Sequence, residues 1–104
     1  MNRTEAFGRK NRIEKPVIRH MLLLTEELGV AILRGHYGAS ADIDISFEYS
    51  EQTGETHMRV SFPDTGFDPL LQGDPVSVAL IRNASSDLTS GAERGQCVIA
   101  CKVR

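Results

Sequence analysis

The chain lacks several features that would place it in a familiar class of protein. Its only cysteines, Cys97 and Cys101, fall four residues apart in one predicted strand. They would lie on the same side about 13 Å apart at ~3.3 Å per residue, too far for a disulfide. The longest apolar run, residues 21–24, is far too short to span a membrane. Residues 1–6 contain no apolar signal core. We therefore expect a cytoplasmic protein with two reduced thiols and no membrane insertion.

The chain also lacks an excess of either charge. Its formal net charge of -2 gives no electrostatic reason to bind nucleic acid or an anionic membrane. Apolar residues make up 40% and charged residues 25%, as in globular proteins, which argues against global disorder. A chain of 104 residues can form one core of two packed layers but not two independent cores. We expect one domain over residues 1–104, in which residues 1–12 form a short helix or a flexible arm.

Two longer helices are predicted, over residues 16–34 and 75–85. Pro16 begins the first, because the N–H that proline lacks would be unpaired at that position. Gly35 and Gly38 end it. Apolar residues at helical spacing predict the buried faces, namely Val17, His20, Met21, Leu24, Leu28, Ala31 and Ile32 in the first helix and Val76, Ala79, Leu80 and Ala84 in the second.

Four strands are predicted around these helices. Residues 41–50 alternate between apolar and polar side chains, which is typical of a half-buried strand. Gly54 supplies the positive φ of a hairpin turn over residues 51–55. The next strand covers residues 56–62, with Met58, Val60 and Phe62 facing inward. The remaining segments are a loop over 63–74, a short strand from Leu88, a turn over 90–95 and a last strand over 96–103. These elements predict an α+β fold: a two-layer α/β sandwich with a mostly antiparallel four-stranded sheet and helices packed on one face.

This order of elements, together with two motifs, resembles the GHKL (Bergerat-fold) histidine-kinase-like ATPase superfamily. Residues 24–37, Leu-Thr-Glu-Glu-Leu-Gly-Val-Ala-Ile-Leu-Arg-Gly-His-Tyr, resemble a family helix that usually reads Glu-Glu-Leu-x-x-Asn-Ala-Ile-x-His. Residues 66–69, Gly-Phe-Asp-Pro, followed by Val-Ala-Leu-Ile-Arg at 78–82, resemble the family's Gly-Phe-Asp-Pro loop and the helix after its glycine box. The likeness covers about residues 13–104 and is closest to the anti-sigma-factor serine kinases. The family's first strand has no counterpart here, which implies a trimmed chain or part of a longer protein.

The resemblance implies a site for ATP and Mg²⁺ whose key residues are altered. In the family, a helix asparagine coordinates Mg²⁺ and a glutamate one turn earlier acts as base in kinase-like members. Glu27 matches the glutamate, but the asparagine position falls on Ala31, which offers no oxygen to a hard cation. The family's adenine-reading aspartate falls on Phe62 in an ungapped alignment. If the alignment skips two residues, Asp64 and Gly66 take the places of the aspartate and glycine of the family's loop.

The phosphate cradle and the lid are altered as well. The family's second glycine box lets backbone N–H groups at a helix start hold phosphates. Here its glycines fall on Pro75, which lacks an N–H, and on Ser77, whose β-carbon blocks a close approach. The ATP lid is reduced to about residues 70–74. Because four parts of the nucleotide chemistry are weakened together, we expect no bound cofactor and no ATP turnover.

Simpler roles remain open for the candidate residues. Glu27 is either a vestigial base or a solvated or salt-bridged helix residue. Asp64 and Asp68 either bind adenine or a cation or cap their own backbone in turns. His20, His36 and His57 do not have the spacing of a metal site, so no metal is expected.

The resemblance therefore implies a regulatory or protein-interaction role in bacterial signalling. The partner would be another protein, such as a sigma factor or its antagonist, or a second copy of the chain in a homodimer. The alternative is an active serine kinase that binds ATP and Mg²⁺, with Glu27 as base and Asp64 and Gly66 contacting the nucleotide. A third reading is a structural module of a larger membrane-associated sensor.

Overall fold

The computed structural model describes residues 13–35, 42–64, 66 and 68–104. These residues form the elements α2 (Lys15–Gly35), β1 (Asp44–Tyr49), β2 (Thr56–Pro63), α3 (Pro69–Gln72), α4 (Pro75–Ala84), β3 (Ser85–Glu93) and β4 (Gln96–Val103). The helix or arm predicted over residues 1–12, together with Gly38 and His36, lies outside the described part of the chain. None of the described helices is both long enough and apolar enough to cross a membrane.

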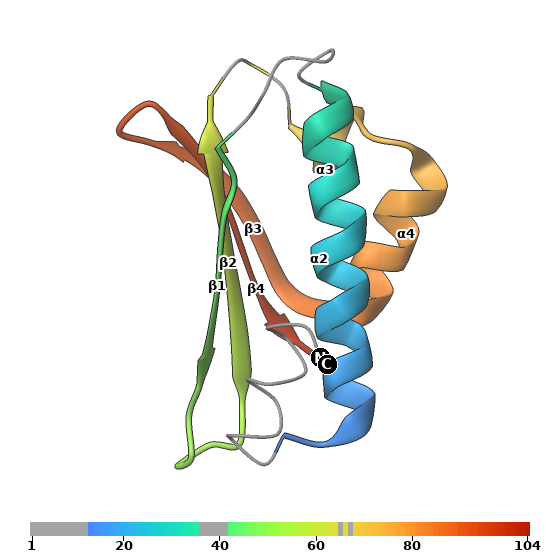
Figure 1. Cartoon of the computed structure of the whole chain (residues 1–104), viewed down its shortest axis with the longest axis vertical. Coiled ribbons are helices and arrows are strands. Elements are labelled where there is room, and N and C mark those ends of the chain that lie inside the picture. The colour runs from blue at the N-terminus through green and yellow to red at the C-terminus, as the bar shows by residue number, and fades with distance from the viewer. Residues whose placement is uncertain (1–12, 36–41, 65, 67) are drawn as a thin grey trace.

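A four-stranded sheet forms one layer and the helices form the other (Figure 1). The strands lie in the order β1-β2-β4-β3, and every neighbouring pair is antiparallel. β1 and β2 form the predicted hairpin, with Gly54 at a φ of 71° in its turn. α2 and α4 lie side by side on the same face of the sheet. The predicted α+β fold, a two-layer sandwich with helices on one face, is confirmed.

The core lies between α2 and the inner face of the sheet. Residues three and four apart share a helix face, and the four that point inward from α2 are fully buried: Met21, Leu24, Leu28 and Ile32. Alternate strand residues point inward: Met58, Val60 and Phe62 from β2, and Cys97, Ile99, Cys101 and Val103 from β4. Both cysteines are buried free thiols, as their spacing predicts. The core therefore fixes α2 across the two central strands.

The buried face of α4 differs from the predicted one. Ile81 and Ala84 are buried, but three side chains predicted to point inward are exposed: Val76, Ala79 and Leu80. The reason is the junction with β3, which follows α4 without a loop. Ser85 pairs with Val103 in the sheet, and its hydroxyl donates to the Ile81 carbonyl at 2.6 Å. This junction sets the rotation of the helix, so the predicted inward face is wrong except at Ala84.

The connections also differ from the predictions. The expected loop over 63–74 contains the short helix α3, which begins because Asp68 Oδ1 accepts a hydrogen bond from the Leu70 N–H at 2.8 Å. β3 begins at Ser85 rather than at Leu88 and continues to Glu93. The predicted turn over 90–95 therefore shrinks to two residues. These are Arg94 and Gly95, with φ of 51° and 77°, as tight hairpin turns require.

Candidate functional site

A groove of about 500 Å³ lies where the C-terminal half of α2 meets the start of α4. The residues that line it from α2 are Glu26, Glu27, Val30, Ala31, Arg34 and Gly35, and those from the segment after α3 and the first turn of α4 are Gln72, Gly73, Asp74 and Ser77. Glu27 and Ala31, the two helix positions singled out in the sequence, both line it. The groove therefore coincides with the position where the resemblance implies the nucleotide site.

Glu27 is partly exposed and forms a hydrogen bond to α4. The Ser77 hydroxyl donates to Glu27 Oε2 at 2.6 Å, and both side chains are partly buried. Among the residues that the structure describes, Glu27 has no salt bridge. The hydrogen bond joins α2 to the first turn of α4 across 50 positions of sequence. It engages one of the two carboxylate oxygens of Glu27.

The first turn of α4 has few free amide donors. Pro75 has no N–H. The Val76 N–H donates to Asp74 Oδ1 at 3.1 Å, and the Val78 N–H donates to the Asp74 carbonyl at 2.9 Å. Ser77 is the one first-turn residue whose N–H has no partner among the described residues. A phosphate at a helix start is held by several free N–H groups. At the start of α4 most of these groups are missing or already bonded to Asp74, so little is left to hold a phosphate.

The charges around the groove are mostly negative. Three carboxylates line it, from Glu26, Glu27 and Asp74, against one guanidinium, from Arg34. None of the four forms an ion pair within the described ranges. The asparagine position of the family is occupied by Ala31, whose methyl group cannot coordinate a cation. An unshielded triphosphate would therefore be repelled here.

Asp64 and Gly66 do not line the groove. Asp64 Oδ1 accepts from the Gly66 N–H at 3.0 Å, and Gly66 has a φ of 86°. Asp68 caps α3 with one carboxylate oxygen and accepts from the Ser90 hydroxyl at 2.7 Å with the other. Both aspartates thus cap local backbone, which was the simpler of the two roles considered. Burial raises the pKa of the Cys97 thiol, and the carboxylates of Asp68 and Asp64 raise it further.

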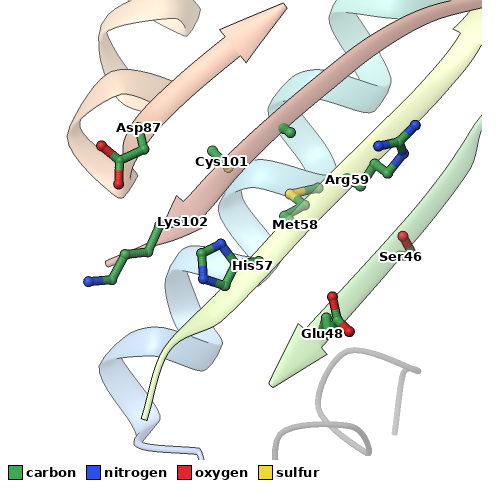
Figure 2. Close-up of a pocket in the computed structure, with 9 residues that line it drawn as sticks. Ser46, Glu48, His57, Met58, Arg59, Asp87, Cys101 and Lys102 are labelled. Carbon is green, nitrogen blue, oxygen red and sulfur yellow. The ribbon is translucent and has the colours of Figure 1, made fainter. Parts of the chain in front are cut away.

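A second, shallower hollow of about 220 Å³ lies on the outer face of the sheet, which the described helices leave uncovered (Figure 2). His57 and Lys102 are directly paired on β2 and β4. Glu55 accepts from Lys102 Nζ at 3.0 Å and lies 3.2 Å from His57 Nε2. The hydrogen bonds from Lys102, and then from His57, hold the pKa of the Glu55 carboxyl below its ordinary value. Ordinary surface ion pairing accounts for this cluster.

Sequence reasoning missed two residues that define the groove. Asp74 provides the cap of α4, and the Asp-Pro pair at 74–75 is a typical helix-start signal that could have identified it. Glu26, which is exposed, lines the groove next to Glu27 and was not singled out in the sequence. No cluster of three or more histidine, cysteine or acidic side chains suited to a metal ion occurs among the residues that the structure describes.

Comparison of this chain with protein-family models, with curated proteins and with solved structures gives no match.

Proposed function

We propose that this chain is a histidine-kinase-like ATPase domain that has lost its nucleotide chemistry and acts as a regulatory protein-interaction module. The observation that carries the proposal is the groove between α2 and α4. The resemblance assigns this position to a magnesium-bound triphosphate. Here it presents Ala31 at the metal-ligand position and three carboxylates in place of a phosphate cradle.

Two further features support the loss of nucleotide binding. Asp74 and Pro75 together leave few of the amide donors that a phosphate would need at the start of α4. Asp64, the candidate adenine reader, uses one oxygen to cap the Gly66 N–H and does not line the groove. After residue 13, the elements follow the order that the resemblance assumes, apart from the additional short helix α3.

A domain of this kind would act by contact with another protein. By analogy with the kinase branch of the family, the partner is a sigma factor or its antagonist in bacterial signalling, or a second copy of the chain. The chemistry of the site requires no cofactor for such a role. Binding of a partner would change which surfaces of that partner are accessible.

One observation favours the alternative of an active serine kinase. Glu27 points into the largest of the described hollows and lies next to the first turn of α4. The alternative requires that substitution of Glu27 or Asp64 by alanine abolish phosphate transfer to a partner. It also requires a magnesium ligand in place of Ala31.

Isothermal titration calorimetry with ATP and Mg²⁺ tests the proposal. We expect no measurable heat of binding up to about millimolar nucleotide, because the groove offers few donors and excess negative charge. A dissociation constant of about 1 μM would overturn the proposal and favour the alternative of an active serine kinase. ADP with Mg²⁺ is the matched control, since both nucleotides share the adenine and ribose.

A further inference from the structure

The helical layer, which forms the groove, exposes more large apolar side chains than the rest of the described molecule. Five of the six large apolar residues that are exposed belong to the helical layer: Val30, Leu33, Leu71, Val76 and Leu80. Apolar side chains that gather on one side of a surface are typical of interaction sites. The helical layer, rather than the outer face of the sheet, therefore has the composition of a binding surface.

Helical spacing brings part of this apolar surface to the groove. Val30 lines the groove from α2 and is 42% exposed. Val76 and Leu80 lie four residues apart and so share one face of α4. They flank Ser77, which lines the opposite wall of the groove. Exposed apolar side chains thus lie on both helices that form the groove.

The floor of the groove attracts positive charge. Glu26 is exposed and Glu27 is partly buried, and Asp74 carries a third carboxylate. Arg34 is the one cation among the lining residues. A cationic side chain that enters the groove gains more from these carboxylates than it would in bulk water, because the local dielectric constant is lower. Anionic lipid surfaces and acidic peptides would be repelled.

We propose that this groove binds a basic amphipathic helix of a protein partner. An arginine or lysine of the partner would point at Glu26 and Glu27, and the partner's apolar face would cover Val30, Val76 and Leu80. A helix lying in a groove between two helices is a common mode of peptide recognition. This inference rests on the proposed function, because a magnesium-bound nucleotide in the groove would exclude the helix.

The charges favour a different protein over a second copy of this chain. A two-fold contact centred on the groove would place two equal sets of carboxylates opposite each other. Like charges facing each other across an interface disfavour association. A basic helix from another protein instead neutralises the groove.

Two synthetic helical peptides of about 18 residues, or five turns, provide the test. They share leucines at helical spacing in an alanine background, and one carries arginines where the other carries glutamates. We expect the arginine peptide to shift the backbone amide resonances of Val30, Ser77 and Leu80 in a titration followed by nuclear magnetic resonance. It should bind at least about tenfold more tightly than the glutamate peptide.

Two variants with the same change of charge locate the effect. Glu26→Lys alters the groove, and Glu48→Lys alters the outer face of the sheet; both side chains are exposed. We expect Glu26→Lys to weaken the arginine peptide by about fivefold to tenfold, and Glu48→Lys by less than about twofold. Equal losses in both variants, equal affinity for both peptides, or shifts confined to the outer face would overturn the inference.

Absence of binding by either peptide up to about millimolar concentration would also overturn it. That failure is distinguishable from failure of the proposed function. If magnesium and ATP bind in the calorimetric experiment, the proposed function fails. If neither nucleotide nor peptide binds, this inference fails and the proposed function stands.

Discussion

The core and the groove lie on different faces of the same helix, α2, and are built in different ways. The core face of α2 is a stripe of four fully buried apolar side chains that pack on β2 and β4. The groove face is polar, and its contacts to α4 are made by the Glu27–Ser77 hydrogen bond and by the cap at Asp74. The core depends on side-chain volume, whereas the groove depends on a few directed hydrogen bonds.

Under the proposed function, this difference explains how the fold persists without nucleotide chemistry. Packing of the core tolerates any change on the groove face that keeps α2 helical. The groove, in contrast, loses a ligand as soon as one donor or one metal ligand is replaced. Here the polar groups that remain bond to their own chain, as Asp74 and Glu27 do. A stable scaffold with an internally satisfied groove is the expected result.

The largest effect is expected from a change on the core face of α2. Leu28→Ala should lower the free energy of unfolding by about 2–5 kcal/mol, because Leu28 is fully buried and the cavity would not refill. Leu33→Ala on the same helix is the matched control. Leu33 is 50% exposed, so its loss should cost less than about 1 kcal/mol. Urea unfolding measures both, and equal losses would contradict the assignment of the two faces.

Two glycine-to-alanine changes are expected to have opposite signs. A β-carbon at Gly73, which lines the groove, would clash with the Pro69 carbonyl oxygen, so Gly73→Ala should destabilise the fold by about 1–3 kcal/mol. A β-carbon at Gly29 in α2 meets no atom within 4 Å. Gly29→Ala should therefore stabilise the fold by about 0.5–1 kcal/mol. Thermal unfolding followed by circular dichroism distinguishes them, and destabilisation by Gly29→Ala would show that α2 packs differently.

The cap of α4 should make an intermediate contribution. Asp74→Ala removes the acceptor for the Val76 N–H and should cost about 0.5–2 kcal/mol. Asp74→Asn keeps the acceptor and should cost much less. Neither change should create a phosphate site, since Pro75 still supplies no donor. Chemical unfolding of the two variants checks this, and similar losses for both would mean that charge rather than capping stabilises the helix start.

The smallest effect is expected from the core thiols at high pH. Burial raises the pKa of Cys101 from 9.0 to about 11. The unfolded chain therefore ionises first, so stability is complete below about pH 9 and declines as pH rises towards 11. Cys101→Val should flatten this decline in urea unfolding series. A wild-type slope in the variant would show that other groups cause it.

Much of the fold could be predicted because apolar periodicity determines which faces are buried. The prediction of β4 over 96–103 matches the structure, and that of the first long helix differs by one residue at each end. The inward face of α4 could not be predicted, since Val76 and Leu80 form an equally regular apolar strip. Only the pairing of Ser85 with Val103 selects Ile81 instead. α3 was missed because four residues carry too little periodicity to detect.

Less of the candidate site could be predicted. The position of Glu27 and Ala31 on one side of α2 follows from helical spacing, and both line the groove. The separation of Asp64 from that groove depends on the path of the loop after β2, which has no periodic signal. The exposure of Val76 and Leu80 depends on the rotation of α4, which the sequence pattern does not determine. Local capping by Asp64, Asp68 and Asp74 was recognisable in principle from turn and helix-start residues.

The central claim is that the groove between α2 and α4 no longer holds a magnesium-bound triphosphate. The most direct measurement is a titration of the isotope-labelled chain with ATP and Mg²⁺, following the amide resonances of Glu27, Ala31 and Ser77. We expect these resonances to stay unchanged up to about millimolar nucleotide. Saturable shifts of the same three resonances, absent when Mg²⁺ is omitted, would contradict the claim.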